Sequence, residues 1–592
     1  MNTQTDDELL IGNRNWHTKN STNNFNHSIS IFWGFAWLSR DTEIPTMANV
    51  LEEESFQKLR QWIILYKDDG AYKVVSKTFS REKASCVTQL LSDGHGKEIL
   101  SVMEQCSSSP ALIDREPLLF AYALCCKSTD KNTKTQAEKL CDKICRTPCD
   151  FFQMLKFHKN FSITKSWGRY FKRLISSWYH NQDAYQLARN VSREVSYLGW
   201  SHRDVLRMGH LKPKTDEMDL IFKYLVLGHG ETKKSFGKSE KESIQKLLEF
   251  FSAVDTAKHS DDVQQVAKLV EEHHLKKDHL CTKLLKQKEI WTALLKDMTI
   301  QDTLDHIGQL ANIGYLDESF EGSQFVIDKL LNEALLTEQN VQPFEIIIAS
   351  SFYKEGKKKP TSWQHNEKVT KALETALEYL LKNNLKSSNK RYVVGIRVGV
   401  NKNKSSVRGT MALSTTTAAA GVAMLMTREE EKTDVVFFTD TITPLKVAKD
   451  TKLTYICSEV AEQVKKADEQ KEENQPKPEV DDEEEEQDIF YGVLPDPCDL
   501  VAPIQWATDQ KKDVDVFIIV TDANRSTGSR NLGEAIAQYR KDRNLPNTKL
   551  VTVGLTNSNM KFANLEDENM LDVSGFDARV PKVIRTFVSG EY

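Results

Sequence analysis

The sequence has few of the residues that mark disulfide-rich, collagen-like or membrane-spanning proteins. Its 592 residues include only 10 Cys, 25 Gly and 15 Pro. Because the cysteines lack a short regular spacing, we expect free thiols in a reducing compartment. The longest early apolar run, Ile29 to Leu38, is much shorter than the roughly 20 apolar residues that span a bilayer. With 39% hydrophobic and 28% charged residues, the chain is expected to be a soluble globular protein.

The charge is unevenly distributed along the chain. The net charge is −5, but residues 468–488 hold 12 acidic residues and two lysines, so the remainder is mildly basic. A basic remainder fits a polyanionic partner, although lysines scattered over solvated faces would give the same excess. Because it is so acidic and contains Pro476 and Pro478, the segment 468–488 is predicted to be a disordered surface loop. A solvated insertion is its simplest interpretation, and an intramolecular RNA mimic is the alternative.

Helical periodicity dominates the first two thirds of the chain. Residues 1–46 are rich in Asn, Thr and Ser and predict a disordered extension, with Met47 as a candidate alternative start. Within 47–385, apolar residues recur at steps of three and four, which predicts many short amphipathic helices. Such helices usually stack pairwise as an α-solenoid, and an irregular helical bundle is the alternative. Examples of the pattern are Val87, Leu90 and Leu91; Ile244, Leu247, Leu248 and Phe251; and Trp291, Leu294 and Leu295.

The pattern changes after about residue 390 to continuous apolar runs. Runs bounded by polar turns are typical of parallel strands that are covered on both faces. They predict a doubly wound α/β domain over 390–592, with a buried helix at Met411 to Met426 between the first two strands. The predicted strands are Tyr392 to Ile396, Asp434 to Phe438, Val514 to Val520 and Leu550 to Leu555.

A basic stripe is predicted on a helix that begins near residue 167. Arg169, Lys172 and Arg173 are three and four residues apart, so their side chains point to one side among Trp167, Tyr170 and Phe171. Such a stripe neutralises RNA phosphates and releases their counterions, which makes binding depend on salt. A solvated helix face is the alternative.

The segment 199–213 combines an aromatic residue, histidines and cations. Ser201 is a candidate N-cap of a helix that carries Arg203 and Arg207 four residues apart, and His210 and Lys212 follow. His202 is a candidate donor to a phosphate or a stacking partner of a base, and Trp200 is a candidate stacking platform. The alternative for His202 is a structural cap or a core histidine.

Two clusters invite a metal interpretation that their spacing does not favour. His273, His274 and His279 lack the His-Glu-x-x-His spacing of zinc proteases, so a solvated helix is favoured, with an RNA contact as the alternative. Cys141, Cys145 and Cys149 repeat every four residues, but Pro148 is expected to end their helix before Cys149, and a zinc site needs a fourth ligand. We expect buried small apolar side chains there.

Seven blocks of the sequence are similar to one known family. Residues 116–125 (EPLLFAYALC), 167–179 (WGRYFKRLISSWY), 199–213 (GWSHRDVLRMGHLKP) and 271–280 (EEHHLKKDHL) resemble the TROVE module of the Ro ribonucleoprotein autoantigen family. Residues 392–400 (YVVGIRVGV), 515–522 (DVFIIVTD) and 570–577 (MLDVSGFD) resemble the von Willebrand factor A domain that follows TROVE in that family. The blocks occur in the family order and cover roughly residues 50–592.

The resemblance implies a HEAT-like helical-repeat ring followed by an α/β domain. It implies that the ring admits single-stranded RNA 3′ ends and that its outer surface holds small Y RNAs. It further implies binding of misfolded noncoding RNA such as ribosomal RNA precursors, a role in RNA stability and quality control, and RNA-processing proteins as partners. The expected location is cytoplasmic, with the nucleus as a second site. By this resemblance His202 belongs to the Y RNA surface, and Arg189 and Arg193 extend it.

One departure from the family pattern concerns the cation site of the A domain. Such domains hold a divalent cation through an Asp-x-Ser-x-Ser loop, helped by a Thr and an Asp from later loops. This chain has Arg397 in place of the acid, followed by Gly399 and Asn401, and Cys498 in place of the Thr, while Asp522, Asp440 and Asp499 persist. Because a guanidinium repels a cation, we expect no tight Mg²⁺ binding and no other cofactor. We expect Arg397 to pair with Asp522.

The sequence therefore predicts an RNA-binding protein with no membrane partner. The alternative is a protein-interaction scaffold that uses the helical array and the A domain. An enzyme such as a nuclease is a third possibility, but the sequence offers no paired carboxylates and no nucleophile with a base to support it.

Overall fold

The computed structural model describes most of the chain after residue 46. The described residues are 47–161, 167–193, 196–355, 363–383, 387–398, 406–439, 441–474, 499–522, 531–557, 559–564 and 566–592. The chain divides into two compact units, Met1–Glu53 and Glu54–Tyr592, and the description below concerns the second. The predicted extension 1–46 lies outside the described residues. Within the described ranges, no helix has the length and apolarity needed to cross a membrane.

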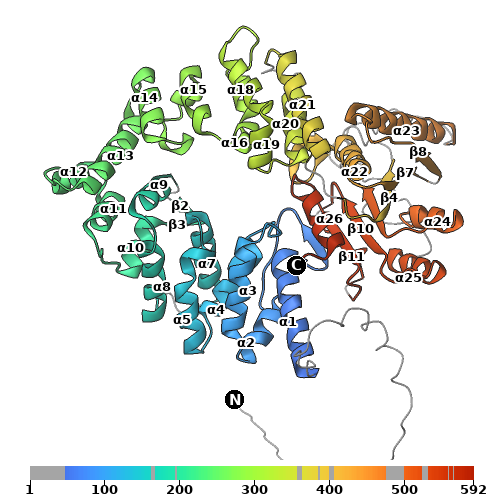
Figure 1. The fold of residues 1–592 in the computed structure, drawn as a ribbon, viewed down its shortest axis with the longest axis horizontal. Coiled ribbons are helices and arrows are strands. Elements are labelled where there is room, and N and C mark those ends of the chain that lie inside the picture. The colour runs from blue at the N-terminus through green and yellow to red at the C-terminus, as the bar shows by residue number, and fades with distance from the viewer. Residues whose placement is uncertain are drawn as a thin grey trace, which may run out of the picture. The chain divides into compact units, whose positions relative to one another are not determined.

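Helices form nearly all of the structure between residues 47 and 383, and many of them contact the next helix in the chain, as α3 does α4 and α14 does α15 (Figure 1). This succession confirms the predicted helical-repeat fold. Its first half comprises α1 (Met47–Ile64), α2 (Ser85–Ser92), α3 (Gly96–Ser108), α4 (Glu116–Cys126), α5 (Lys131–Lys139), α6 (Cys141–Ile144), α7 (Pro148–Asn160), α8 (Arg169–His180), α9 (Ala184–Arg193) and α10 (His202–Gly209). Its second half comprises α11 (Asp216–Leu227), α12 (His229–Phe236), α13 (Glu242–His259), α14 (Val263–His273), η1 (Lys277–His279), η2 (Leu284–Lys286), α15 (Lys288–Asp297), α16 (Ile300–Asp305), α17 (Ile307–Asn312), α18 (Gly322–Leu330), α19 (Glu333–Glu338), α20 (Pro343–Glu355) and α21 (Glu367–Asn383).

The apolar faces of the helices are buried as the sequence pattern predicts. In α13, the apolar residues Ile244, Leu247, Leu248 and Phe251 are all buried, and in α15 Trp291, Leu294 and Leu295 are buried. Polar caps start several helices, because a side-chain oxygen accepts a hydrogen bond from a free N–H of the first turn. Asp130 caps α5 and Thr147 caps α7 in this way. A short hairpin of β2 (Ser196–Tyr197) and β3 (Trp200–Ser201) interrupts the helices before α10.

A mixed, mainly parallel sheet follows the helices and confirms the predicted α/β fold. Its order is β1-β11-β10-β9-β4-β7-β8, and only β8 runs antiparallel to its neighbour. The four predicted strands correspond to β4, β7, β9 and β10. The strands are β1 (Ala71–Lys73), β4 (Arg391–Arg397), β7 (Lys432–Phe438), β8 (Ile442–Leu445), β9 (Val516–Thr521), β10 (Lys549–Gly554) and β11 (Met570–Ser574).

Both faces of the sheet are covered, as the continuous apolar strands require. Along β9, Val516, Ile518 and Val520 belong to one core, which continues into the helical part. Phe517 and Ile519 belong to a second core on the opposite face. The helices of this part are α22 (Thr415–Glu429), α23 (Leu453–Asn474), α24 (Ala502–Asp509), α25 (Leu532–Asp542) and α26 (Val580–Ser589).

Two sequence predictions in this part need correction. The helix expected at Met411 to Met426 begins later, because residues up to Ser414 form β6 (Thr410–Ser414), which pairs with β5 (Ser406–Val407). The side chain of Ser414 then caps α22 by accepting a hydrogen bond from the N–H of Thr417. The acidic segment 468–488 is not a loop from its start, since α23 extends through it to Asn474. Residues 475–488 lie outside the described residues.

Both ends of the helical succession contact the sheet region, so this unit is a closed array. At the start, β1 follows α1 in the chain and pairs in parallel with β11 at the edge of the sheet. The paired residues are Ala71 with Asp572, Tyr72 with Val573, and Lys73 with Ser574. At the end, α20 contacts β6, and α21 contacts α22. The rings of Phe344 and Phe576 lie 5.0 Å apart across this second junction. The sequence does not predict β1.

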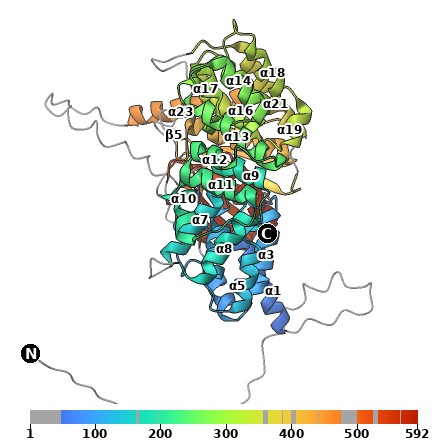
Figure 2. The same ribbon diagram turned by 90° about the vertical axis from the view of Figure 1, so that its left-hand side faces the viewer.

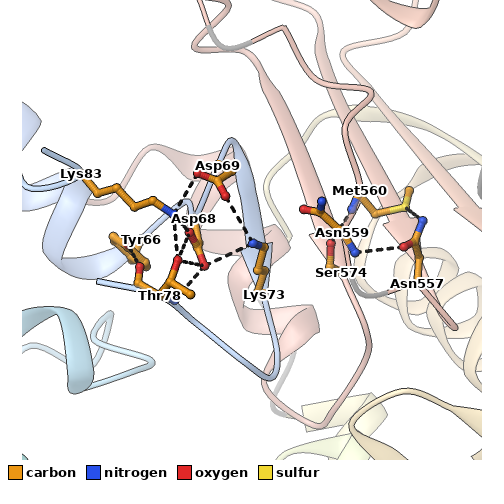
Figure 3. Close-up of polar contacts among 10 residues, drawn as sticks. All are labelled: Tyr66, Asp68, Asp69, Lys73, Thr78, Lys83, Asn557, Asn559, Met560 and Ser574. Atoms are coloured by element: carbon orange, nitrogen blue, oxygen red, sulfur yellow. Dashed lines mark hydrogen bonds and ion pairs between the residues drawn. The ribbon is translucent and has the colours of Figure 1, made fainter. Parts of the chain in front are cut away.

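A buried carboxylate holds the turn that leads into β1 (Figure 3). Asp68 is 0% exposed, and its side chain accepts a hydrogen bond of 2.8 Å from the N–H of Thr78. It pairs with Lys73 at 3.2 Å and also with Lys83. Burial opposes ionisation, but the hydrogen bonds from Lys83 and Thr78 hold the pKa of Asp68 below its ordinary value. Asp68 therefore fixes β1 at the edge of the sheet.

We expect Asp68→Asn to lower the free energy of unfolding by about 3 kcal/mol, because it leaves two lysines beside an uncharged partner. Urea unfolding measures this change. The control is Asp69→Asn, whose carboxylate is 52% exposed and also pairs with Lys83, and it should cost less than about 1 kcal/mol. Equal effects of the two variants would contradict the role of Asp68.

The same cluster predicts a pH dependence. Because the pKa of Asp68 is lowered on folding, its stabilising effect is complete above its ordinary value of 3.8. The effect is lost as the pH falls through the lowered pKa. The wild type should therefore lose more stability than Asp68→Asn as the pH falls through this range. Urea unfolding of both proteins at several acidic pH values measures the difference.

Candidate nucleic-acid interface

The first helix of the predicted interface is α8, and it presents the basic stripe. Arg169 and Arg173 are exposed and Lys172 is half-buried, while Phe171 and Leu174 on another side face the core. Arg173 lies 3.5 Å from Glu138, but its side chain remains 63% exposed. Such an exposed ion pair contributes little, so the guanidinium can exchange this partner for another anion.

The second helix is α10, and its start confirms the predicted cap. Ser201 accepts a hydrogen bond of 3.1 Å from the N–H of Asp204. Arg203 and Arg207, one turn apart, are exposed, whereas Val205 and Leu206 are buried.

The residues that follow α10 are exposed as well. His210 ends the helix in the left-handed conformation, with φ 49°, and Lys212 is exposed two residues later. The carbonyl oxygen of Lys212 is 3.1 Å from Nε2 of His180, at the end of α8. This contact joins the segment that follows α10 to the C-terminal end of α8.

The helices α8, α10 and α5 lie beside one another (Figure 1 and Figure 2). The structure brings α8 and α10 into contact, and α5 contacts α8 as well. On α5, Lys131 and Lys139 are exposed, and Nζ of Lys134 lies 5.5 Å from the ring centre of Tyr170. These lysines were missed from the sequence, although their close spacing in a strongly polar segment was a visible signal. We call Arg169, Arg173, Arg203, Arg207 and Lys212 the basic face.

The structure corrects the prediction for His202. Its side chain is 0% exposed, and Nδ1 is 2.7 Å from Oη of Tyr179. The imidazole lies 4.8 Å from the ring of Phe152 and 6.2 Å from that of Trp178. A ring enclosed in this way cannot reach a phosphate or a base, so His202 is a core histidine, the alternative that the sequence left open.

Trp200 is likewise buried rather than an open stacking platform. It is 8% exposed, and its ring lies 5.5 Å from that of Trp167. Nζ of Lys159 lies 5.4 Å from the centre of the indole. Both aromatic predictions therefore failed for one reason, which is that neighbouring aromatic rings such as Phe152 and Trp167 enclose these side chains.

Arg189 and Arg193, on α9, contact residues outside the basic face. Arg193 is 3.5 Å from Asp278, and Arg189 donates a hydrogen bond of 3.4 Å to the carbonyl of His274. Both partners lie in or next to η1, which α9 contacts. Their extension of the basic face therefore stays a prediction.

The three neighbouring histidines are separated by their local structure. His279 is buried, with Nε2 3.0 Å from Oγ of Ser192, and burial lowers its pKa to about 3. His274 ends α14 in the left-handed conformation, with Nδ1 2.6 Å from Asp297. Among the described residues, no group of three or more His, Cys, Asp or Glu could hold a metal ion.

The cysteine prediction is confirmed for the burial of Cys141 and Cys145, whereas Cys149 is half-buried, and it is wrong for the helix. Cys141 and Cys145 are buried, and burial raises the pKa of Cys145 well above its ordinary value. However, α6 ends at Ile144, and Pro148 begins α7 instead of ending a helix. A proline fits the first turn, where its missing N–H has no helical partner. All cysteines in the described ranges are free.

The predicted ion pair of the A domain is present at the ends of two adjacent strands. Nη1 of Arg397, at the end of β4, lies 2.5 Å from Oδ1 of Asp522, just after β9, with side chains 2% and 4% exposed. Asp499 accepts a hydrogen bond of 3.0 Å from the N–H of Val501. Gly399, Asn401, Asp440 and Cys498 lie outside the described residues. The described donors do not fit a divalent cation, because a guanidinium already neutralises Asp522.

We expect His202→Ala to lower the free energy of unfolding by about 2–4 kcal/mol, because it leaves a cavity and removes the partner of Tyr179. Tyr179→Phe, which removes only the hydroxyl, should cost about 1 kcal/mol. The neighbouring change Arg203→Ala, on an exposed side chain, should stay within about 0.5 kcal/mol. Urea unfolding measures all three. A fully stable His202→Ala variant that has lost RNA affinity would contradict the burial.

Comparisons with known proteins agree on one family. A family model described as the TROVE domain matches residues 49–358, and one described as the Ro60 vWA domain matches 391–473 and 494–588. The chain is 23% identical to the RNA-binding protein RO60 of Caenorhabditis elegans, over 90% of this chain and 88% of that protein. It is 24% identical to the RNA-binding protein RO60 of Deinococcus radiodurans, over 90% and 92%.

A solved structure supports the same conclusion for the fold. The crystal structure of the Deinococcus radiodurans RO (RSR) protein matches with a TM-score of 0.74 and 21% identity, covering 91% of this chain and all of that one. The TROVE match alone covers more than half of the sequence, and the Ro60 A domain follows it in order. The chain therefore belongs to the Ro60 family of TROVE-domain proteins with a von Willebrand factor A domain.

Proposed function

We propose that the protein binds structured RNA through the basic face. The observation that carries this proposal is the state of its cations. In the described ranges, Arg169, Arg203, Arg207 and Lys212 are exposed and form no ion pair. Exposed cations without protein partners can neutralise RNA phosphates and release the counterions condensed on the RNA, which favours binding at low salt.

The alternative, a protein-interaction scaffold, fits this surface less well. Protein interfaces are usually centred on exposed aromatic or apolar side chains. The large hydrophobic side chains that are exposed in the described residues lie outside α8 and α10. The two relatives compared above are named RNA-binding proteins, which also supports RNA as the partner. Neither observation favours catalysis.

The finer function rests on membership of the family. We propose that the structured ligand is a small noncoding RNA of the Y type. Single-stranded 3′ ends of misfolded noncoding RNA, such as ribosomal RNA precursors, would be a second class of ligand. The biological role would be RNA stability and quality control in the cytoplasm, with the nucleus as a second location and RNA-processing proteins as partners.

We expect Arg169→Ala/Arg173→Ala and Arg203→Ala/Arg207→Ala each to weaken binding to a small structured RNA by about tenfold or more. Each double variant should also reduce the slope of log K against log salt by about 2, because two phosphate contacts are lost. Fluorescence anisotropy with a labelled RNA hairpin measures both quantities.

A matched control is Lys246→Ala/Lys268→Ala, which removes two lysines on α13 and α14 that are 64% and 75% exposed. It should bind as the wild type does. If the two arginine variants also bind as the wild type does, the assignment of the basic face fails.

We also propose that the A domain binds no divalent cation tightly, and the buried pair of Arg397 with Asp522 supports this. A ligand that binds only the folded state raises the midpoint of thermal unfolding. Millimolar Mg²⁺ at constant ionic strength should therefore leave this midpoint unchanged. A rise of several degrees would contradict the proposal.

A further inference from the structure

Three lysines from distant parts of the chain converge at the C-terminal end of α26. Lys67 follows α1, Lys390 precedes β4, and Lys549 is the first residue of β10. Nζ of Lys390 donates a hydrogen bond of 2.9 Å to the carbonyl oxygen of Val588. Nζ of Lys549 donates one of 2.6 Å to the carbonyl oxygen of Phe587, the preceding residue. We call Lys67, Lys390 and Lys549 the lysine cluster.

A buried aromatic ring connects Lys67 to the other two lysines. Phe587 is 0% exposed, and Nζ of Lys549 lies 4.8 Å from the centre of its ring. Nζ of Lys67 lies 5.4 Å from the same centre and donates a hydrogen bond of 2.9 Å to the carbonyl oxygen of Met570. All three lysines of the cluster are half-buried. Their ammonium groups are therefore held near one another, while the side chains stay partly accessible to solvent.

The lysine cluster carries more positive charge than its hydrogen-bond partners balance. All three partners are backbone carbonyls, and the C-terminal end of a helix carries only about half a negative charge. One lysine would therefore be enough to cap α26. An ammonium group has three N–H donors, and the carbonyl takes one of them. The cluster thus has both charge and donors available for an anion.

The carboxylates near the lysine cluster have other partners or face water. The pKa of Asp515 is lowered mainly by Arg391, with which it pairs at 2.8 Å, and less by Lys390. The acids that attract Lys67 are Asp572, which accepts hydrogen bonds from the N–H groups of Phe562 and Ala563, Asp567, which pairs with Arg540, and Glu568, which is exposed. In the part of the chain that the structure describes, none of the three lysines forms an ion pair.

Mutual repulsion adds to the cost of burying these lysines. Burial, followed by the charges of Lys390 and Lys67, lowers the pKa of Lys549 to about 8. Burial also lowers the pKa of Lys67, although the nearby acids oppose this shift. A bound anion would relieve both effects, since it supplies the opposite charge.

We infer that the lysine cluster binds a small free diphosphate. A diphosphate carries several negative charges and has enough oxygens to accept a hydrogen bond from each of the three ammonium groups. The cluster lies where β10 and β11 begin, and none of its residues belongs to the basic face. The inferred site is therefore separate from the proposed RNA-binding surface.

A small anion fits the lysine cluster better than RNA does. The ring beside the ammonium groups, Phe587, is buried and offers no face on which a base can stack. Asp515 and Glu568 lie near opposite members of the cluster, Lys390 and Lys67, and would repel a phosphate backbone that extends beyond it. A ligand confined to the three lysines avoids this repulsion.

Isothermal titration calorimetry of the full-length protein with inorganic pyrophosphate, without Mg²⁺ and at constant ionic strength, tests this inference. We expect the wild type to bind pyrophosphate. Lys390→Met and Lys549→Met should each weaken the affinity by about tenfold or more, because a hydrogen bond between charged groups is lost. Methionine has a similar unbranched side chain, so the packing beside Phe587 is retained.

Thermal unfolding without ligand distinguishes an anion site from a helix cap. If Lys549 only capped α26, Lys549→Met would lower the midpoint of unfolding and leave the pyrophosphate affinity unchanged. In an anion site, removal of one of three repelling charges should leave this midpoint unchanged or raise it. The matched control is Lys541→Met, which removes an exposed lysine of α25. It should change neither the midpoint nor the affinity for pyrophosphate.

Three results would overturn the inference. They are no pyrophosphate binding by the wild type at low ionic strength, wild-type affinity for pyrophosphate in both Lys390→Met and Lys549→Met, and loss of RNA hairpin affinity in both variants, which would make the cluster an RNA contact. If Lys549→Met does not fold, Lys390→Met decides in the same way. If pyrophosphate fails to bind while Arg169→Ala/Arg173→Ala still weakens hairpin binding, only this inference is wrong and the proposed function stands.

Discussion

The parallel pairing of β1 with β11 is the contact on which the closed array depends. It joins the start of the helical succession to the last strand of the sheet, and Lys67 donates a hydrogen bond to Met570, 503 residues away. A strand of three residues is short, so the pairing needs the turn that Asp68 holds. Because α20 and α21 contact the same region from the other end, the helices between them are held at both ends.

The charges of the protein are used in two different ways. Asp68 with its lysines and Arg397 with Asp522 are buried pairs, which are costly to form and strongly destabilising to break. The cations of the basic face are exposed and mostly unpaired, so they contribute little to stability. Because folding does not depend on these cations, they are available to bind a ligand. In the A domain, the buried pair of Arg397 and Asp522 lies at the ends of the adjacent strands β4 and β9.

Much of the fold could be predicted from the sequence, whereas much of the site could not. The central strands were predictable because both faces are buried, which makes their sequences continuously apolar. The strand β1 was not, since three residues carry no pattern. Pro148 was ambiguous because proline both ends helices and begins them. The exposed cations of α8 and α10 followed from helical spacing.

The roles of individual aromatic residues depend on packing that spacing does not show. His202 and Trp200 have the chemistry of RNA contacts, but both are buried by neighbours far away in sequence, such as Phe152 and Trp167. Tyr197, three residues before Trp200, is exposed instead. The only local signal for the turn was Gly199, which adopts its positive φ of 78° without steric cost, whereas Leu198 gave none.

The measurement that tests the account most directly is the salt dependence of RNA affinity for the unmodified protein. A small structured RNA should bind, and log K should fall linearly with log salt, with a slope of roughly −3 to −5 if four or five phosphates contact the basic face. An affinity that does not change with salt, or no binding at low salt, would contradict the account and favour a protein-interaction scaffold.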